Sequence, residues 1–249
     1  MIRADALLVE RGLAPDLAKA RALILAGQVV AGERRVEKAA QPLDPTVLLR
    51  LKGRAARSYV SRAGHKLAGA LDDFQVDPTG CVCLDLGAST GGFSDCLLQR
   101  GAARVYAVDV GHGHLDHRLA ADPRLVNLER TDARALDTTL VPEPVDLVVA
   151  DISFNSLWRV LAPALALLRV GGRAVLLVKP QFEVAAAEVG TGGIVRDATL
   201  HARVVAEARE GAESLGLWVE GVAASVLPGT KGNVEFLLAA RKGEASQRR

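Results

Sequence analysis

The residues Leu84-Asp-Leu-Gly-Ala-Ser-Thr-Gly-Gly-Phe-Ser-Asp95 decide the fold, because they combine a strand, a glycine turn and a helix in direct succession. The apolar run 81–86 predicts a short buried strand, and residues 93–100 predict a helix. Glycines between the two allow the backbone to approach a ligand closely, and the first turn of the helix presents free N–H groups. This order predicts a binding turn in an α/β fold.

The turn favours a positively charged ligand over a phosphate. It lacks the G-x-G-x-x-G spacing of dinucleotide-binding turns and the Gly-Lys-Ser/Thr group that grips phosphates. Asp85 lies in the strand end, where its carboxylate would repel a phosphate. A second strand, 104–109, ends in Asp109, the position from which such folds bind ribose hydroxyls. These features predict a nucleoside site for S-adenosylmethionine; the alternative is an ordinary α/β turn with incidental glycines.

Composition limits the class of protein. The 249 residues can form one large domain and a small one, and 49% apolar with only 4% aromatic residues is typical of a parallel sheet under Ala-rich helices. We find no membrane-length apolar run and no signal peptide, and therefore expect a cytoplasmic protein without a membrane partner. Cys81, Cys83 and Cys96 are odd in number and lack a second ligand pair, which favours buried free thiols over a metal site or disulfides.

Charge is distributed unevenly although the net charge is only +2. Residues 1–60 contain 11 of the 31 basic and 6 of the 29 acidic side chains, so this part carries +5 and the remainder −3. A basic small segment beside a near-neutral larger one suggests a nucleic-acid-binding part attached to a catalytic body. On charge alone, a solvated surface explains the excess equally well.

The larger part of the chain alternates strands and helices, which predicts a parallel sheet with helices on both faces. Further strands are predicted at 125–129, 145–151 and 173–179, and helices at 157–168 and 201–216. The last two strands, 217–225 and 233–240, are joined by a glycine-rich hairpin, which makes the C-terminal strand antiparallel. Asp85, Asp109, Asp151 and Lys179 all fall at strand ends, where open parallel sheets bind ligands.

The first 58 residues form a separate region. Helical spacing is predicted from Arg3 to Gly12 and from Pro15 to Gly27, followed by a strand at 29–30 and a basic linker at 51–58. Residues 3–13, 20–24 and 26–29 resemble an S4 RNA-binding domain, although Asp16-Leu17 stands where Ser-Arg is common. The resemblance implies RNA contacts by basic residues of this region and of the linker's end: Arg3, Lys19, Arg21, Arg34, Arg35 and Arg62. Ser61 is predicted to cap the next helix, which carries Lys66.

Beyond this region, the glycine turn, Val148–Phe154, Leu177–Glu183, Gly192–Asp197 and Gly232–Leu237 resemble the TlyA family. These are S-adenosylmethionine-dependent rRNA 2′-O-methyltransferases with an FtsJ-like body, residues 59–249 here, and some members are named haemolysins. The resemblance places a Lys-Asp-Lys-Glu tetrad on Lys66, Asp151, Lys179 and Glu235. It places the cofactor site, which also includes Asp85 by the argument above, on Gly87, Ala88, Ser89, Gly91, Gly92, Phe93, Asp109 and Asp132. Asn155 and Gly113-His-Leu115 depart from the family pattern.

The resemblance implies methylation of a cytidine ribose in ribosomal RNA without a metal ion. The 2′-hydroxyl is a poor nucleophile, so Lys179 would remove its proton as a neutral amine, a form that burial and the nearby Lys66 favour. The family's longer members modify both subunits, and this chain has short flanking segments, so the large subunit is the expected target. Two alternatives are a membrane-active haemolysin and a catalytically inactive RNA-binding assembly factor.

Overall fold

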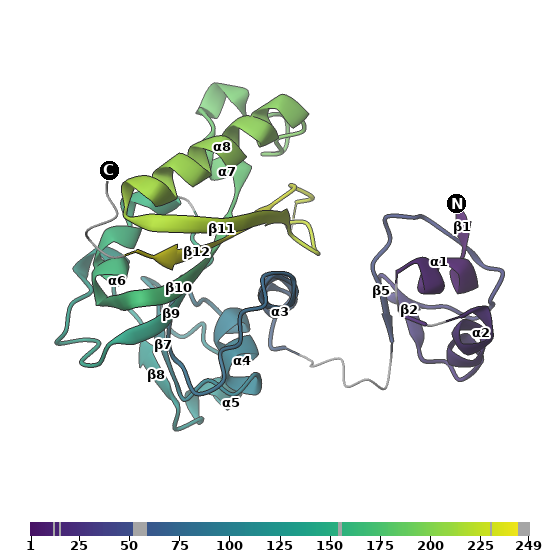
Figure 1. Ribbon diagram of the computed structural model, residues 1–249, viewed down its shortest axis with the longest axis horizontal. Coiled ribbons are helices and arrows are strands. Elements are labelled where there is room, and N and C mark those ends of the chain that lie inside the picture. The colour runs from purple at the N-terminus through teal and green to yellow at the C-terminus, as the bar shows by residue number, and fades with distance from the viewer. Residues whose placement is uncertain (12, 15, 52–58, 154–155, 230, 244–249) are drawn as a thin grey trace. The chain divides into compact units, whose positions relative to one another are not determined.

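The computed structural model describes residues 1–249 apart from 12, 15, 52–58, 154–155, 230 and 244–249. The chain divides into two compact units, Met1–Ser58 and Tyr59–Arg249 (Figure 1). Several predictions concern residues outside the described ones: the helix end at Gly12, the helix start at Pro15, the linker over 52–58, and the departure at Asn155.

The N-terminal unit packs two helices on short antiparallel strands. Helix α1 (Ala4–Glu10) buries Leu7 and Leu8, and α2 (Leu17–Leu25) buries Ile24, as expected for helices with one apolar face. The strands are β1 (Ile2–Arg3) paired with β4 (Pro42–Leu43), and β2 (Val29–Ala31) between β3 (Arg34–Arg35) and β5 (Leu49–Leu51).

Asp16 begins helix α2. Its carboxylate accepts a hydrogen bond of 2.7 Å from the backbone N–H of Lys19, one of the free donors of the first helical turn. The acid that stands where the S4 pattern commonly has serine therefore has a structural role in this chain.

The C-terminal unit is built on one seven-stranded sheet in the order β11-β12-β10-β9-β6-β7-β8. The strands from β10 to β8 are parallel, whereas β12 runs antiparallel to both β10 and β11. The predicted mostly parallel sheet with an antiparallel C-terminal strand is confirmed. The bounds are β6 Val82–Leu86, β7 Arg104–Val108, β8 Leu125–Leu128, β9 Val145–Ala150, β10 Leu168–Val178, β11 Leu217–Ala224 and β12 Phe236–Lys242.

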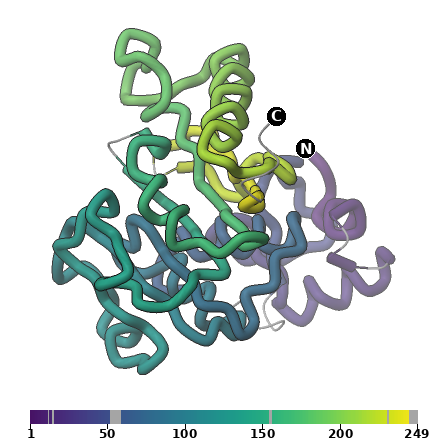
Figure 2. The backbone as a smooth tube through the Cα atoms, turned by 60° about the vertical axis from the view of Figure 1, so that its left-hand side comes forward, coloured from purple at the N-terminus to yellow at the C-terminus, as the bar shows by residue number. Residues whose placement is uncertain are grey.

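Helices cover both faces of this sheet, because successive side chains of a strand point to opposite faces. On one face, Cys83 of β6 and Leu177 of β10 pack with α3 (Ala63–Asp73) and α4 (Gly92–Gln99). On the other, Leu84 and Leu176 share a core with α6 (Leu161–Leu167) and α8 (Ala198–Ser214). Helix α8 lies along β11 in both views (Figures 1 and 2). The shorter helices are α5 His117–Ala120, α7 Pro180–Glu183, η1 Ala133–Ala135, η2 Leu157–Arg159 and η3 Ala186–Glu188.

Several predicted boundaries are wrong. Helix α3 begins at Ala63 without a side-chain cap, so Ser61 does not cap it. Strand β10 begins at Leu168, because the Gly171-Gly172 turn is accommodated as an irregularity within the strand rather than before it. Strand β12 begins at Phe236, so residues 233–235 belong to the preceding connection, 225–235.

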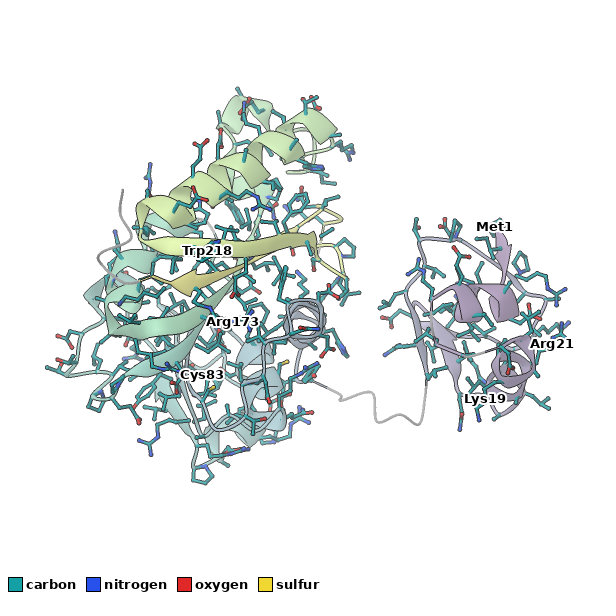
Figure 3. The ribbon with its side chains drawn as sticks, viewed as in Figure 1. Met1, Lys19, Arg21, Cys83, Arg173 and Trp218 are labelled. Atoms are coloured by element: carbon teal, nitrogen blue, oxygen red, sulfur yellow. The ribbon has the colours of Figure 1, made fainter. Side chains whose placement is uncertain are left out.

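Strand β11 lies at one edge of the sheet, and its register with β12 shifts between Val219 and Gly221. Glu220, at the shift, accepts hydrogen bonds from Arg173 of β10 and Arg241 of β12 at 2.5–3.0 Å. Figure 3 labels Arg173 together with Trp218, which is largely exposed on β11.

Cys81, Cys83 and Cys96 are thiols that form no disulfide bond with one another, and burial raises the pKa of Cys83 well above its usual range. Within the described part of the chain, no cluster of three or more His, Cys, Asp or Glu residues could hold a metal ion. The described helices include none with the length and apolar character needed to cross a membrane.

Candidate active site

The glycine turn after β6 brings the backbones of three elements together. Gly87 has a φ of 77°, and a Cβ on it would lie 2.7 Å from the backbone oxygen of Asp151, which follows β9. Gly91, with a φ of 91°, directly precedes α4. A Cβ on Gly92 would overlap Ser61 Oγ, just before α3. Side chains at positions 87 and 92 would therefore push these elements apart, which explains the glycines of the turn.

Two adjoining cavities open at the carboxyl ends of the parallel strands. The larger has a volume of about 400 Å³, and its lining includes Asp109, His114, Asp132, Ile152 and Val160. The smaller has a volume of about 230 Å³, and its lining includes Ser61, Lys66, Phe93, Lys179 and Glu235. Gly87, Ser89, Asp151 and Ser153 line both.

Asp109 is fixed at the wall of the larger cavity by the backbone. Its Oδ2 accepts a hydrogen bond of 2.8 Å from the N–H of Ser89, and its Oδ1 accepts one of 2.7 Å from the N–H of Gly111. Each carboxylate oxygen can accept a further hydrogen bond. Asp132 lines the same cavity and forms an ion pair of 2.5 Å with Arg134, which lowers the pKa of the Asp132 carboxyl to about 2.

The predicted cofactor-binding residues divide between the two spaces. Ala88 and Phe93 line the smaller cavity, whereas Gly91 and Gly92 line neither and act through the shape of the turn. His114, from the Gly113-His-Leu115 departure, lies in the larger cavity. Sequence reasoning gave this residue no binding role.

Asp85 does not lie where the sequence predicted it, in contact with a bound ligand. Its side chain is fully buried and lines neither cavity. Its Oδ2 accepts a hydrogen bond of 2.7 Å from Ser94 Oγ of α4, and its Oδ1 is buried without a hydrogen-bond partner among the described residues. Burial raises the pKa of Asp85 to about 7, against the opposing effect of Ser94. The Asp85 side chain points into the protein interior and bonds to α4, the helix that follows the turn.

Two lysine–carboxylate pairs line the smaller cavity. Lys66 of α3 donates a short hydrogen bond to Glu235 of the 225–235 connection, and these two side chains are 8% and 3% exposed. Lys179, directly after β10, lies 2.5 Å from Asp151 Oδ1, directly after β9. The four predicted tetrad residues therefore meet in one space, although they come from four separate segments.

Two further residues support these pairs and were missed by sequence reasoning. Ser153 accepts a hydrogen bond of 2.8 Å from Lys179 Nζ, and only its place two residues after Asp151 could have indicated it. Gly229 faces Glu235: a Cβ there would lie 2.5 Å from Glu235 Oε1, so a larger residue would displace the carboxylate from Lys66. Sequence offers no signal for this contact across the connection.

The candidate RNA-binding residues differ in their surroundings. Arg3 and Arg21 both donate hydrogen bonds to the buried Asp5, at 2.8–3.0 Å, and with it form a local ion-paired cluster that holds the pKa of Asp5 far below its usual range. Lys19, Arg34 and Arg35 are exposed, and none has a carboxylate within 4.0 Å among the described residues. Figure 3 labels Lys19 and Arg21 on the N-terminal unit. Arg62 lines the smaller cavity and donates to the backbone oxygen of Pro228 at 2.7 Å.

A parallel sheet with a glycine turn, an acid at the next strand end and an adjoining charged cavity is an open α/β fold that binds a nucleoside-type ligand at the carboxyl ends of its strands. The sequence profile of the FtsJ-like methyltransferase family matches residues 59–242, and the chain belongs to this family.

Similarity to individual proteins extends over both units. The chain is 48% identical to the 16S/23S rRNA (cytidine-2′-O)-methyltransferase TlyA of Mycobacterium tuberculosis, over 95% of this chain and 88% of the relative. It is 34% identical to the 23S rRNA (cytidine-2′-O)-methyltransferase TlyA of Campylobacter jejuni, over 80% of this chain and 79% of the relative. A solved structure of a protein named haemolysin from Streptococcus thermophilus superimposes with a TM-score of 0.73 at 37% identity. The match covers 97% of this chain and 88% of that protein. The resemblance to the TlyA family is thus confirmed.

Asp85 predicts a pH-dependent stability of the C-terminal unit. An aspartate in an unfolded chain has a pKa of about 3.9, whereas the pKa of Asp85 in the folded chain is about 7. The folded state therefore holds a proton that the unfolded state releases, and stability falls as pH rises from about 4 through about 7. Asp85→Asn should flatten this fall, since its amide oxygen can still accept from Ser94.

The measurement is the thermal midpoint Tm between pH 5 and 8, followed by the fluorescence of Trp158 and Trp218, the two tryptophans of the chain. Each kcal/mol corresponds to about 2–4 °C for a unit of this size. Asp137→Asn, at an exposed acid bonded only within its own turn, is the control and should keep the wild-type slope. Parallel slopes for wild type and Asp85→Asn would refute the assignment.

Proposed function

We propose that this protein transfers the methyl group of S-adenosylmethionine to the 2′-hydroxyl of a cytidine ribose in ribosomal RNA. The observation that carries the proposal is the pairing of Lys179 with Asp151 and of Lys66 with Glu235 in a cavity adjoining that of Asp109. The cytidine and the ribosomal RNA come from the names of the two TlyA relatives.

The larger cavity fits a nucleoside. Its volume of about 400 Å³ lies in the range of small-molecule sites, and Val108, Ile152 and Val160 give it apolar walls suited to a base. Asp109, held by two backbone N–H groups, would accept hydrogen bonds from ribose hydroxyls. Gly87 and Ser89, at the junction of the two cavities, would let the reactive end reach the smaller space. S-adenosylmethionine supplies a methyl group on a positively charged sulfur, which needs no further activation.

Lys179 acts as the general base. Its Nζ takes the proton of the 2′-hydroxyl as the oxygen attacks, which requires the neutral amine. Asp151 and Ser153 orient the amine, and Asp151 stabilises the ammonium that forms. Lys66, held by Glu235, lines the same cavity and fixes its opposite wall. The remaining contribution is positioning of the two reactants in line.

The N-terminal unit is proposed to act as an S4-like domain that holds RNA by its backbone. Its helices, short antiparallel strands and exposed cations are the supporting features. Lys19, Arg34 and Arg35 are the strongest candidates, because Arg3 and Arg21 already share the carboxylate of Asp5.

The large ribosomal subunit is the favoured target, since 23S rRNA occurs in the names of both TlyA relatives and 16S rRNA in only one. The alternative function, a membrane-active haemolysin, is supported by the name of the Streptococcus thermophilus protein. The inactive assembly factor is the alternative that a measurable turnover would eliminate.

Asp109→Ala should weaken binding of S-adenosylmethionine by about 1.5–3 kcal/mol, because the cofactor's hydrogen bonds to a charged acceptor are removed. Titration calorimetry measures this directly. Asp137→Ala, at the exposed turn acid, is the control and should bind like wild type. Equal affinities for wild type and Asp109→Ala would remove Asp109 from the site.

Lys179→Ala should reduce methyl transfer by at least about 100-fold, because general-base catalysis contributes roughly 10²–10⁴-fold, while affinity for S-adenosylmethionine changes little. The assay offers purified 30S and 50S subunits separately with methyl-labelled cofactor, and incorporation is expected in 50S. Arg209→Ala, at an exposed cation of α8, is the control. If Lys179→Ala kept more than about a hundredth of the wild-type rate, Lys179 would not be the general base. Equal labelling of 30S and 50S subunits would contradict the large subunit as the target.

The triple variant Lys19→Ala, Arg34→Ala, Arg35→Ala should bind ribosomal RNA more weakly and keep its affinity for S-adenosylmethionine. Each phosphate that the variant no longer neutralises lowers the slope of log affinity against log salt by about 0.7–0.9. Filter binding of an rRNA fragment at several salt concentrations measures the slope. An unchanged slope would show that these cations of the N-terminal unit do not contact phosphate.

A further inference from the structure

Asn233 is buried in the 225–235 connection, two residues before Glu235, yet it lines neither cavity. Its side-chain oxygen accepts a hydrogen bond of 2.9 Å from the N–H of Val195, and its amide donates one of 2.8 Å to the carbonyl of Gly193. A buried amide with both functions bonded fixes its two partners firmly. Asn233 therefore ties the turn at residues 190–195 to the connection that carries Glu235.

Each tied segment also has backbone hydrogen bonds of its own. In the turn, Gly190 and Ile194 form an isolated β-bridge, and the N–H of Gly193 donates to the Gly190 carbonyl at 3.0 Å. In the connection, the N–H of Gly229 donates to the Asn233 carbonyl at 2.8 Å. These hydrogen bonds and those of Asn233 hold the described residues of the two segments together.

Three exposed cations lie along this surface, and we name Arg62, Arg196 and Lys231 the basic rim. Arg62 donates to the Pro228 carbonyl of the connection, which also carries Lys231. Lys231 Nζ lies 3.7 Å from the position that a Cβ on Gly193 would occupy. Arg196 Nη1 lies 3.8 Å from the corresponding position on Gly190. The rim thus runs from the lining of the smaller cavity across both segments.

The charge of the basic rim is not neutralised locally. None of its three members has a carboxylate within 4.0 Å among the described residues. Many arginines of the same unit do have one: Arg100, Arg104, Arg118, Arg124, Arg134, Arg169, Arg173, Arg203 and Arg241. Cations without a carboxylate partner beside a substrate cavity suit a polyanion.

We propose that the basic rim binds backbone phosphates of the RNA strand that carries the target ribose. The inference rests on the proposed function, because it assumes an RNA substrate in the smaller cavity. When a ribose enters that cavity, the phosphates on either side of it stay outside, at the mouth where Arg62 lies. The catalytic unit then aligns its own substrate strand, in addition to any contact by the N-terminal unit. Asn233 is the positioning residue that holds the rim in register with Glu235.

The test is the double variant Arg196→Gln, Lys231→Gln, which removes two charges and keeps polar side chains of similar reach. Arg62 stays unchanged because it lines the catalytic cavity. The matched control is Arg209→Gln, at an exposed α8 cation that also has no carboxylate within 4.0 Å among the described residues. The full-length proteins bind a fragment of 23S rRNA at several salt concentrations. The log–log slope of the double variant should fall by about 0.7–0.9 for each phosphate that it no longer neutralises. KM for RNA should rise while kcat and the affinity for S-adenosylmethionine stay unchanged.

A slope and KM equal to those of Arg209→Gln would overturn the proposal. Unchanged binding to the RNA fragment with reduced methylation of intact 50S subunits would also overturn it, because the rim would then face a ribosomal protein. Failure of the wild type to bind S-adenosylmethionine or to methylate RNA would count against the proposed function. The salt slope for RNA would still report on the rim in that case.

Discussion

The structure depends on bare backbone at two positions of the turn between β6 and α4. At Gly87 the turn touches the backbone of Asp151, and at Gly92 it touches Ser61. Interiors are packed as densely as organic crystals, so even one methyl group at such a contact must displace a neighbour. The displaced neighbours here would be the loop that holds Asp151 and the segment leading into α3, which holds Lys66. The turn therefore sets the shape of both cavities at once.

The two lysine–carboxylate pairs link segments that are distant in sequence. Lys66 and Glu235 are 169 residues apart, and Lys179 joins the end of β10 to the end of β9. Buried ion pairs lose much of their attraction to the cost of leaving water, so they add little net stability. Their effect is geometric: each ammonium has one fixed carboxylate partner. The site is consequently complete only when the sheet and the 225–235 connection are both in place.

Sequence predicted the sheet well, because buried parallel strands are continuous apolar runs with charges only at their ends. It failed where a side chain's role depends on a contact across the fold. Ser61 has the chemistry of a helix cap but packs against Gly92, and Asp85 has the chemistry of a ligand contact but is bonded to Ser94. The stretch from Asn233 has a strand-like pattern, yet Asn233 and Glu235 are held by buried polar partners outside the ladder. Gly229 gave no signal, and Ser153 gave only its place two residues after Asp151, since their neighbours are known only in three dimensions.

The shifted register at Glu220 has a consequence for solubility. An edge strand presents unpaired backbone groups that can recruit a strand from another molecule and start aggregation. In β11 the irregularity between Val219 and Gly221 breaks the even spacing that such a strand would need. Glu220 also places a charge on this edge strand, bound to Arg173 of β10 and Arg241 of β12. The β11 edge of the sheet is thereby less suited to growth by strand addition, even though the large aromatic surface of Trp218 lies on the same strand.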